Sequence, residues 1–298
     1  MTNLQGPATK SYVSVTVREN GVRPAKEWSR SADNGSDEGE KPMPFTPAHI
    51  AAVLPLVSAA RVRRADPWAL AVGAMVPDLP IFLPFLPDYT DWHSWTGVLT
   101  LDLAAAVLLV TLFHHVLRDP LTALLPPALA GRAALLAPAR LRPAPIVAGA
   151  LIGAATHITW DSFTHSTGPA LWGGWLSVEV LGVLPLFRVL QYTSSAAGLA
   201  AVVWWAWRGL ARMAPAPVPE RLAISARVRL GVLAACAAGV VAGALVWPLV
   251  DEPTPALGLP SVLTKTGAGT VVGLCLVLAC YAALWQLRRR RPAVPGRA

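Results

Sequence analysis

Long apolar runs, separated by short charged or proline-rich connectors, follow a polar segment at the start of the chain. Six runs approach the roughly 20 residues that an α-helix needs to cross a bilayer: 68–87, 97–117, 146–165, 194–210, 230–250 and 267–287. A seventh run, 45–60, is short for a span and is predicted either to cross as well or to lie as a re-entrant or interfacial helix. The pattern predicts an all-α, polytopic transmembrane bundle of six to seven spans.

The composition agrees with a surface that faces lipid. Hydrophobic residues make up 54% of the 298 residues, charged residues only 14%, and the mean hydropathy is +0.49. An ordinary soluble domain carries about 25% charged residues and needs them to cover its surface. The composition therefore argues against a soluble globule, and membrane lipids are the expected partners.

The net charge of +8 does not indicate nucleic acid, because the basic residues stand in short clusters between the apolar runs. Clusters of this kind mark cytoplasmic connectors under the positive-inside rule. The rule places the arginines within 61–64, 118–142, 208–229 and 288–291 in the cytoplasm, together with the C-terminus. The acidic connectors that hold Asp88 and Asp91, Glu179, and Asp251 and Glu252 are placed outside.

Four segments differ in composition and predict the domain organisation. Residues 1–42 are polar and read either as a disordered extension or as a mis-assigned start, with translation beginning at Met43. Residues 43–212 form a membrane core that holds the His and Asp residues discussed below, 213–291 a C-terminal pair of transmembrane helices, and 292–298 a basic tail.

Ionisable residues inside an apolar span are costly and mark candidate functional sites. His157, Asp161 and His165 are spaced four apart in the segment HITWDSFTH, so a helix places them along one face. Imidazole and carboxylate are ligands for zinc, manganese and iron. His157 and His165 would lie about 12 Å apart on a regular helix, so either Asp161 bridges two ions or the helix ends early and His165 turns back.

Three further residues are candidates for the same site. Asp78 lies in an apolar run that Pro77, Pro80 and Pro84 predict to be kinked or broken. His93 lies in the following acidic connector and is placed to close over the site, and we expect Asp78 or His93 to act as metal ligand or general base. The alternative is that Asp78 caps a half-helix and that the His and Asp residues only hydrogen-bond between helices.

The segments MPFTPAH, GAMVPDLP, HSWTG, HITWDSFTH and LQYTSSAAG together resemble the bacterial integral-membrane family named domain of unknown function 4184. The resemblance implies a polytopic protein of the bacterial inner membrane and supplies no activity. A more distant likeness to bacterial membrane-bound metal-dependent hydrolases implies site residues at His49, Asp78, His93, His157 and Asp161. PDLP has a single aspartate where that second group often has two, which weakens the metal assignment.

Two functions from different classes follow from these residues. The first is a hydrolase in which zinc or manganese, held by His157, Asp161, His165, Asp78 and His49, activates water against a phosphoester or lipid-linked substrate near the outer leaflet. The alternative is a non-catalytic protein, either a proton or cation relay carrier or a structural scaffold. No Walker A loop, GxGxxG fingerprint or GxSxG elbow is found in the sequence.

Overall fold

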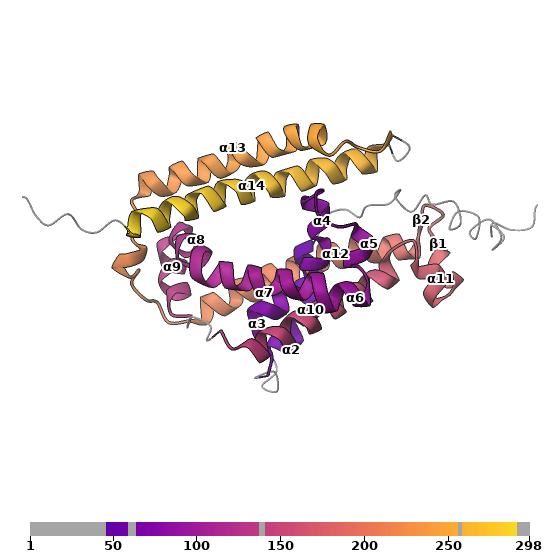
Figure 1. Cartoon of the computed structure of the whole chain (residues 1–298), viewed down its shortest axis with the longest axis horizontal. Coiled ribbons are helices and arrows are strands. Elements are labelled where there is room, and N and C mark those ends of the chain that lie inside the picture. Colours follow the sequence, from indigo (N-terminus) through magenta and orange to yellow (C-terminus); the bar gives the residue numbers. More distant parts are fainter. Residues whose placement is uncertain (1–45, 59–63, 137–140, 256–257, 291–298) are drawn as a thin grey trace, which may run out of the picture. The chain divides into compact units, whose positions relative to one another are not determined.

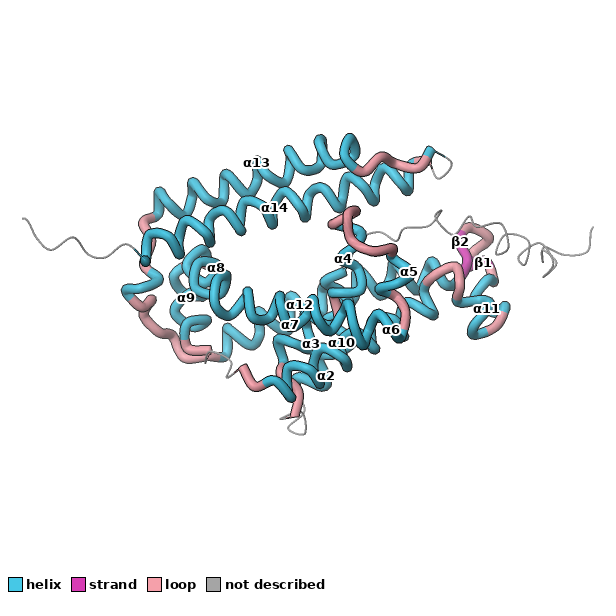
Figure 2. Tube along the Cα trace, viewed as in Figure 1, coloured by secondary structure: helices cyan, strands magenta, loops and turns pink. Residues whose placement is uncertain are grey.

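The computed structural model describes residues 46–58, 64–136, 141–255 and 258–290. Within them the chain is helical, as Figures 1 and 2 show, and its one small sheet pairs β1 (Glu179–Val180) with β2 (Leu184–Pro185) in antiparallel register. The predicted all-α class is confirmed. The segment 1–42, the arginines at 61, 63, 140 and 291 and the tail 292–298 lie outside the described residues.

Four described helices are long and apolar enough to cross a membrane: Trp95–Leu124, Leu186–Arg212, Ala226–Val250 and Leu259–Arg289. They account for four of the six predicted runs. Two shorter apolar helices cover Thr46–Val57 and Pro67–Phe82. Helix α10 (Pro143–Thr164) has 22 residues, but its polar side chains lower its hydropathy below that of the four. The structure therefore shows a membrane-type helical protein, and the count of six to seven spans stays a prediction.

The first long helix is continuous but not uniform. It comprises α6 (Trp95–Gly97), the π-helical turn η5 (Val98–Asp102), α7 (Leu103–Leu112), a second π-helical turn η6 (Phe113–Leu117) and α8 (Arg118–Leu124). Ser94 caps its start by accepting a hydrogen bond from the Gly97 amide. The helix runs past Arg118, where the sequence predicted a connector, and α9 (Pro127–Ala134) follows.

The run 68–87 is broken, as its prolines predicted. Helix α3 (Pro67–Gly73) is capped by the Asp66 carboxylate and gives way to a 3-10 turn, η4 (Val76–Asp78), and the short helix α4 (Leu79–Phe82). Because the turn is 3-10, the Asp78 amide donates to Met75 O rather than to Ala74 O. The carbonyl of Ala74 is therefore free to accept a bond from another element.

Helices α3 and α10 touch along their backbones. A Cβ at Gly153 would lie 2.4 Å from Leu70 O, and a Cβ at Gly73 would lie 2.4 Å from Ala150 O. Only glycine allows such an approach, because a side chain at either position would overlap a carbonyl of the facing helix. This contact brings the C-terminal half of α10 against the break that follows α3.

The remaining elements close the core around α10. The 3-10 turn η2 (Thr46–His49) leads into α2 (Ile50–Ser58), and Gly198 of α12 (Leu186–Arg212) packs directly on Ala48 of η2. The link from α10 to α12 contains α11 (Gly168–Trp172), the 3-10 turn η7 (Gly174–Ser177) and the β-hairpin.

The last two helices, α13 (Ala226–Val250) and α14 (Leu259–Arg290), follow the 3-10 turn η8 (Glu220–Leu222) and lie side by side (Figure 1). Gly243 and Gly269 meet at their crossing, where a Cβ at Gly243 would lie 2.0 Å from Gly269 O. Near the loop that joins the two helices, Lys265 forms a buried ion pair with Asp251. Two long apolar helices thus cover the predicted runs 230–250 and 267–287, and both start earlier than the apolar pattern alone indicated.

Gly153→Ala should destabilise the protein by about 1–3 kcal/mol, because the new methyl group meets backbone atoms that have no room to move. Gly231→Ala on α13 is the matched control, since nothing lies within 4 Å of its Cβ position and alanine favours the helix. Thermal unfolding of both variants in the same detergent tests this expectation. Equal melting temperatures for the two variants would contradict the close contact of α3 with α10.

Candidate metal site

Helix α10 carries two ionisable side chains that point into the protein. His157 and Asp161 are four residues apart, lie on one helical face, and are 1% and 7% exposed. Their side chains meet, with His157 Nε2 3.2 Å from Asp161 Oδ2. The spacing of four residues, from which the sequence predicted a shared helical face, therefore brings the two side chains into contact.

Asp78 approaches this pair from the 3-10 turn η4, where the chain is broken after α3. Its carboxylate is buried, and Oδ2 accepts a hydrogen bond of 2.7 Å from Thr46 Oγ1. Oδ1 has no hydrogen-bond partner among the described residues and lies 3.5 Å from His157 Nε2. Thr46 thus holds the carboxylate with one oxygen directed at α10.

His93 completes the group from the residue that follows helix α5 (Tyr89–Trp92). Its Nδ1 donates to Tyr89 O at 3.1 Å, and its ring stacks on the Tyr89 ring with centroids 3.7 Å apart. Burial raises the pKa of the Tyr89 phenol well above its usual value, and the Asp78 and Asp161 carboxylates raise it further. Tyr89 is therefore a neutral support for the imidazole at physiological pH.

The backbone fixes the orientation of both imidazoles. His157 Nδ1 donates to Ala74 O at 2.8 Å, as His93 Nδ1 donates to Tyr89 O. A carbonyl can only accept, so in each ring Nδ1 carries the proton and Nε2 faces the centre of the group. Metal-binding histidines are typically held in this way, by a bond from the second ring nitrogen to a carbonyl or carboxylate.

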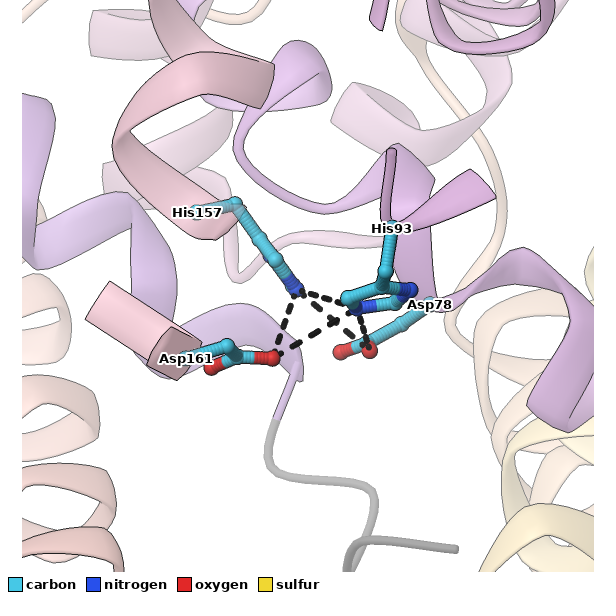
Figure 3. Close-up of side chains that lie close together, drawn as sticks. All are labelled: Asp78, His93, His157 and Asp161. Atoms are coloured by element: carbon cyan, nitrogen blue, oxygen red, sulfur yellow. Dashed lines mark hydrogen bonds and ion pairs between the residues drawn. The ribbon is translucent and has the colours of Figure 1, made fainter. Parts of the chain in front are cut away.

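Figure 3 shows the four side chains converging from three elements, and one donor atom from each lies within 4.8 Å of all the others. Five of the six separations are known individually. His93 Nε2 lies 3.3 Å from His157 Nε2, 3.5 Å from Asp161 Oδ2 and 3.7 Å from Asp78 Oδ1, and the two separations from His157 Nε2 are 3.2 and 3.5 Å. Ligands of a tetrahedral zinc ion lie about 3.3–3.6 Å apart, given metal–ligand bonds of 2.0–2.2 Å.

The charges in this four-residue cluster favour a proton or a metal ion between its members. Two imidazole nitrogens that carry lone pairs face each other, and two carboxylates are buried beside them. Such an arrangement is costly unless a proton or a metal ion lies between the groups. The orphaned Asp78 Oδ1 and the mixed nitrogen and oxygen donors fit a divalent ion such as zinc or manganese.

His49 lies beside the four-residue cluster rather than in it. Its ring stacks on that of His157 with centroids 3.9 Å apart, and its Nε2 lies 3.5 Å from Asp161 Oδ1. The second oxygen of Asp161 therefore points away from the cluster and toward His49. The metal role that the sequence assigned to His49 stays a prediction.

His165 follows the last residue of α10, so the helix ends before it. Its Nδ1 donates to Asp161 O at 3.1 Å and lies 3.8 Å from Asp161 Oδ1, while its Nε2 lies 3.3 Å from the Gln191 amide nitrogen. The helix therefore ends early, as one of the two alternatives for this residue required. His165 is not one of the four clustered donors, and the metal role that the sequence assigned to it stays a prediction.

A cavity of about 200 Å³ reaches the same carboxylates from the other side. It lies between η2 and α2 on one wall and α12 on the other, and its lining includes His49, Asp78, Asp161, His165 and Gln191. His93 and His157 do not line it. The cavity therefore meets the four-residue cluster at its two aspartates.

Sequence reasoning missed three buried polar residues near this site. Thr46 and Gln191 lie in MPFTPAH and LQYTSSAAG, but nothing in those segments shows that they support Asp78 and His165. Asp102 is a buried carboxylate on η5 with no hydrogen-bond partner among the described residues. Its place inside the apolar run 97–117 was the same signal that singled out Asp78, and it could have been found.

Comparison with known proteins gives a family and no activity. The searches of curated proteins and of solved structures each found no match. The family model described as Domain of unknown function (DUF4184) matches residues 43–283, which include every residue of the candidate site. The chain belongs to this family.

Proposed function

We propose that Asp78, His93, His157 and Asp161 bind a divalent metal ion and that the protein is a metal-dependent hydrolase. One observation carries the metal site: the separations of 3.2–3.7 Å between the donor atoms match the edges of a tetrahedral coordination shell. Zinc or manganese suits the two imidazole and two carboxylate donors. The sequence left open whether Asp78 and His93 are ligands or bases, and their place in the four-residue cluster supports the ligand role that we propose for them.

A hydrolytic role further requires a place for water and substrate next to the ion. A bound zinc or manganese ion lowers the pKa of a water molecule and polarises a phosphoryl or carbonyl oxygen. Four protein ligands fill a tetrahedral shell, so a water molecule would have to enter as a fifth ligand. The cavity touches Asp78 and Asp161, so we propose that water and substrate would approach from that side. His49 lies between the cavity and the His157 ring and restricts access to the ion from η2.

We propose a phosphoester or lipid-linked substrate near the outer leaflet. Helix α12, which forms one wall of the cavity, is apolar and long enough to cross a membrane. A substrate dissolved in the bilayer could reach the site sideways, without entering from bulk water.

We also propose the topology that the arginines indicate, with the C-terminus on the cytoplasmic side of a bacterial inner membrane and membrane lipids as partners. Three predicted cytoplasmic segments meet in the structure, since Asp119 pairs with Arg289 of α14 at 3.0 Å and with Arg221 of η8 at 3.8 Å. Arg132 of α9 donates a hydrogen bond to Met213 O and so also joins two of these predicted cytoplasmic segments. A basic surface of this kind is attracted to anionic lipid headgroups.

Elemental analysis of the detergent-purified full chain tests the metal site. We expect about one zinc or manganese ion per chain, lost in His157→Ala and Asp161→Asn because a single missing ligand removes much of the binding energy. His115→Ala and Asp88→Asn, which change exposed residues of the same types, are the matched controls and should keep the ion. Folded wild-type protein without metal would overturn the hydrolase proposal and favour the relay or scaffold.

Phosphate release from a short-chain phosphatidic acid, and from a water-soluble aryl phosphate, tests the reaction. We expect release that stops on chelation, returns when zinc or manganese is added back, and is absent in Asp161→Asn. Metal-loaded protein that hydrolyses neither compound would contradict the assigned phosphoester class while leaving the metal site intact.

Thr46→Val removes the hydroxyl that holds Asp78 Oδ2 while keeping the size of the side chain. Supporting bonds to a ligand are typically worth about 10–100-fold in metal affinity, so the dissociation constant should rise by that factor. Thr111→Val is the control, because among the described residues the Thr111 hydroxyl bonds only to Val107 O of its own helix. A competition titration with a chromophoric chelator measures both, and unchanged affinity in Thr46→Val would contradict the role given to Thr46.

A further inference from the structure

The cavity beside the four-residue cluster is too small for a complete drug-sized ligand. Binding pockets that enclose such ligands occupy about 300–1,000 Å³, whereas this cavity has about 200 Å³. It can hold a polar group of a few heavy atoms, and the remainder of a larger molecule would have to lie outside it.

The α12 wall of the cavity presents hydrogen-bonding groups. Gln191, Ser194 and Ser195 all line it. Arg188 donates to Gln191 Oε1 at 3.4 Å, which turns the amide nitrogen toward His165. The Ser194 hydroxyl accepts from Trp160 Nε1 at 3.2 Å, while the Ser195 hydroxyl has no hydrogen-bond partner among the described residues.

These groups suit the oxygens of an anion. The Ser195 hydroxyl and the amide hydrogen of Gln191 that does not face His165 can donate, and these groups line the same cavity as the two carboxylates. The carboxylates would repel an anion if left bare, but a divalent ion in the four-residue cluster would neutralise them and attract an oxygen of the ligand. The polar end of the ligand is therefore expected to be an oxyanion of phosphate size.

The surroundings of the cavity are apolar. Ala48, Ala51 and Ala52 form the wall opposite α12, and Trp160, which also lines the cavity, is 41% exposed. On α12, Tyr192 and Leu199 lie one turn before and after Ser195 and are also exposed. A ligand whose head occupies the cavity would thus have apolar side chains beside its remaining part.

We infer that this cavity is the headgroup site of an amphiphilic substrate, which places a phosphate-type head against Gln191, Ser194 and Ser195 and leaves its apolar chains along Trp160 and α12. The inference rests on the proposed function and narrows its substrate class to a lipid phosphate. It also assigns Ser195 a role in binding the substrate that is separate from metal binding.

Binding to the full chain, reconstituted in phosphatidylcholine nanodiscs and loaded with zinc, tests this site. The probes are dihexanoylphosphatidic acid, inorganic phosphate and dihexanoylglycerol, each followed by calorimetric titration. We expect the phosphatidic acid to bind at least about tenfold more tightly than either of the others, because only it supplies both the head and the apolar chains.

Two variants fill the cavity from opposite walls: Ser195→Leu on α12 and Ala52→Leu on α2. Each should weaken binding of the phosphatidic acid by about tenfold or more, since the added side chain takes up space meant for the head. Ala197→Leu is the matched control, because it lies about 200° around the same helix from Ser195 and is exposed. It should bind as the wild type does.

The zinc content of every sample separates the two proposals. Protein that holds zinc but binds no phosphatidic acid, or binds it equally well in all three variants, overturns the headgroup site and leaves the metal site standing. Inorganic phosphate or dihexanoylglycerol that binds as tightly as the phosphatidic acid overturns the amphiphilic substrate. Wild-type protein that takes up no zinc overturns the proposed function, and with it this inference.

Discussion

Two carboxylates buried in an apolar helical protein impose the main constraint on this structure. Asp78 and Asp161 are 3% and 7% exposed, and removing such groups from water is costly unless positive charge and hydrogen bonds compensate for the lost hydration. The Thr46 hydroxyl supplies one hydrogen bond, and the two imidazole nitrogens at 3.2–3.7 Å surround, together with the carboxylates, the position where a proton or a metal ion would supply the positive charge. The elements around the site are arranged so that these groups can reach the carboxylates.

Breaks in helices, rather than regular helices, provide most of that arrangement. The prolines after α3 produce the 3-10 turn that carries Asp78 and frees the Ala74 carbonyl for His157. His93 is positioned by the end of α5, and His165 is positioned by the end of α10. The glycines between α3 and α10 bring the break and the His157 face together. Unpaired backbone groups in a membrane protein need partners, and here they find them in the site itself.

Asp161 connects the two halves of the site. Its Oδ2 belongs to the four-residue cluster, whereas its Oδ1 faces His49 and His165 at the cavity. A carboxylate with its oxygens divided in this way can hold an ion on one side and contact a ligand on the other. This division explains why six ionisable residues gather here although only four of them can surround one ion.

The sequence by itself determined the helical class, the broken run around Pro77 and the set of candidate site residues, because hydropathy, proline and helical spacing act locally. It did not determine that the helix containing η5 and η6 would continue past Arg118. It also did not determine which of the histidines would join the cluster. These histidines have identical side chains, and the positions of their elements decide that His93 joins the cluster while His49 and His165 lie beside it. The tertiary structure decided which residues form the cluster. Its members lie a few ångströms apart although they are up to 83 positions apart in the sequence. Their approach depends on backbone contacts such as that of Gly153 with Leu70, and no local sequence pattern contains such contacts.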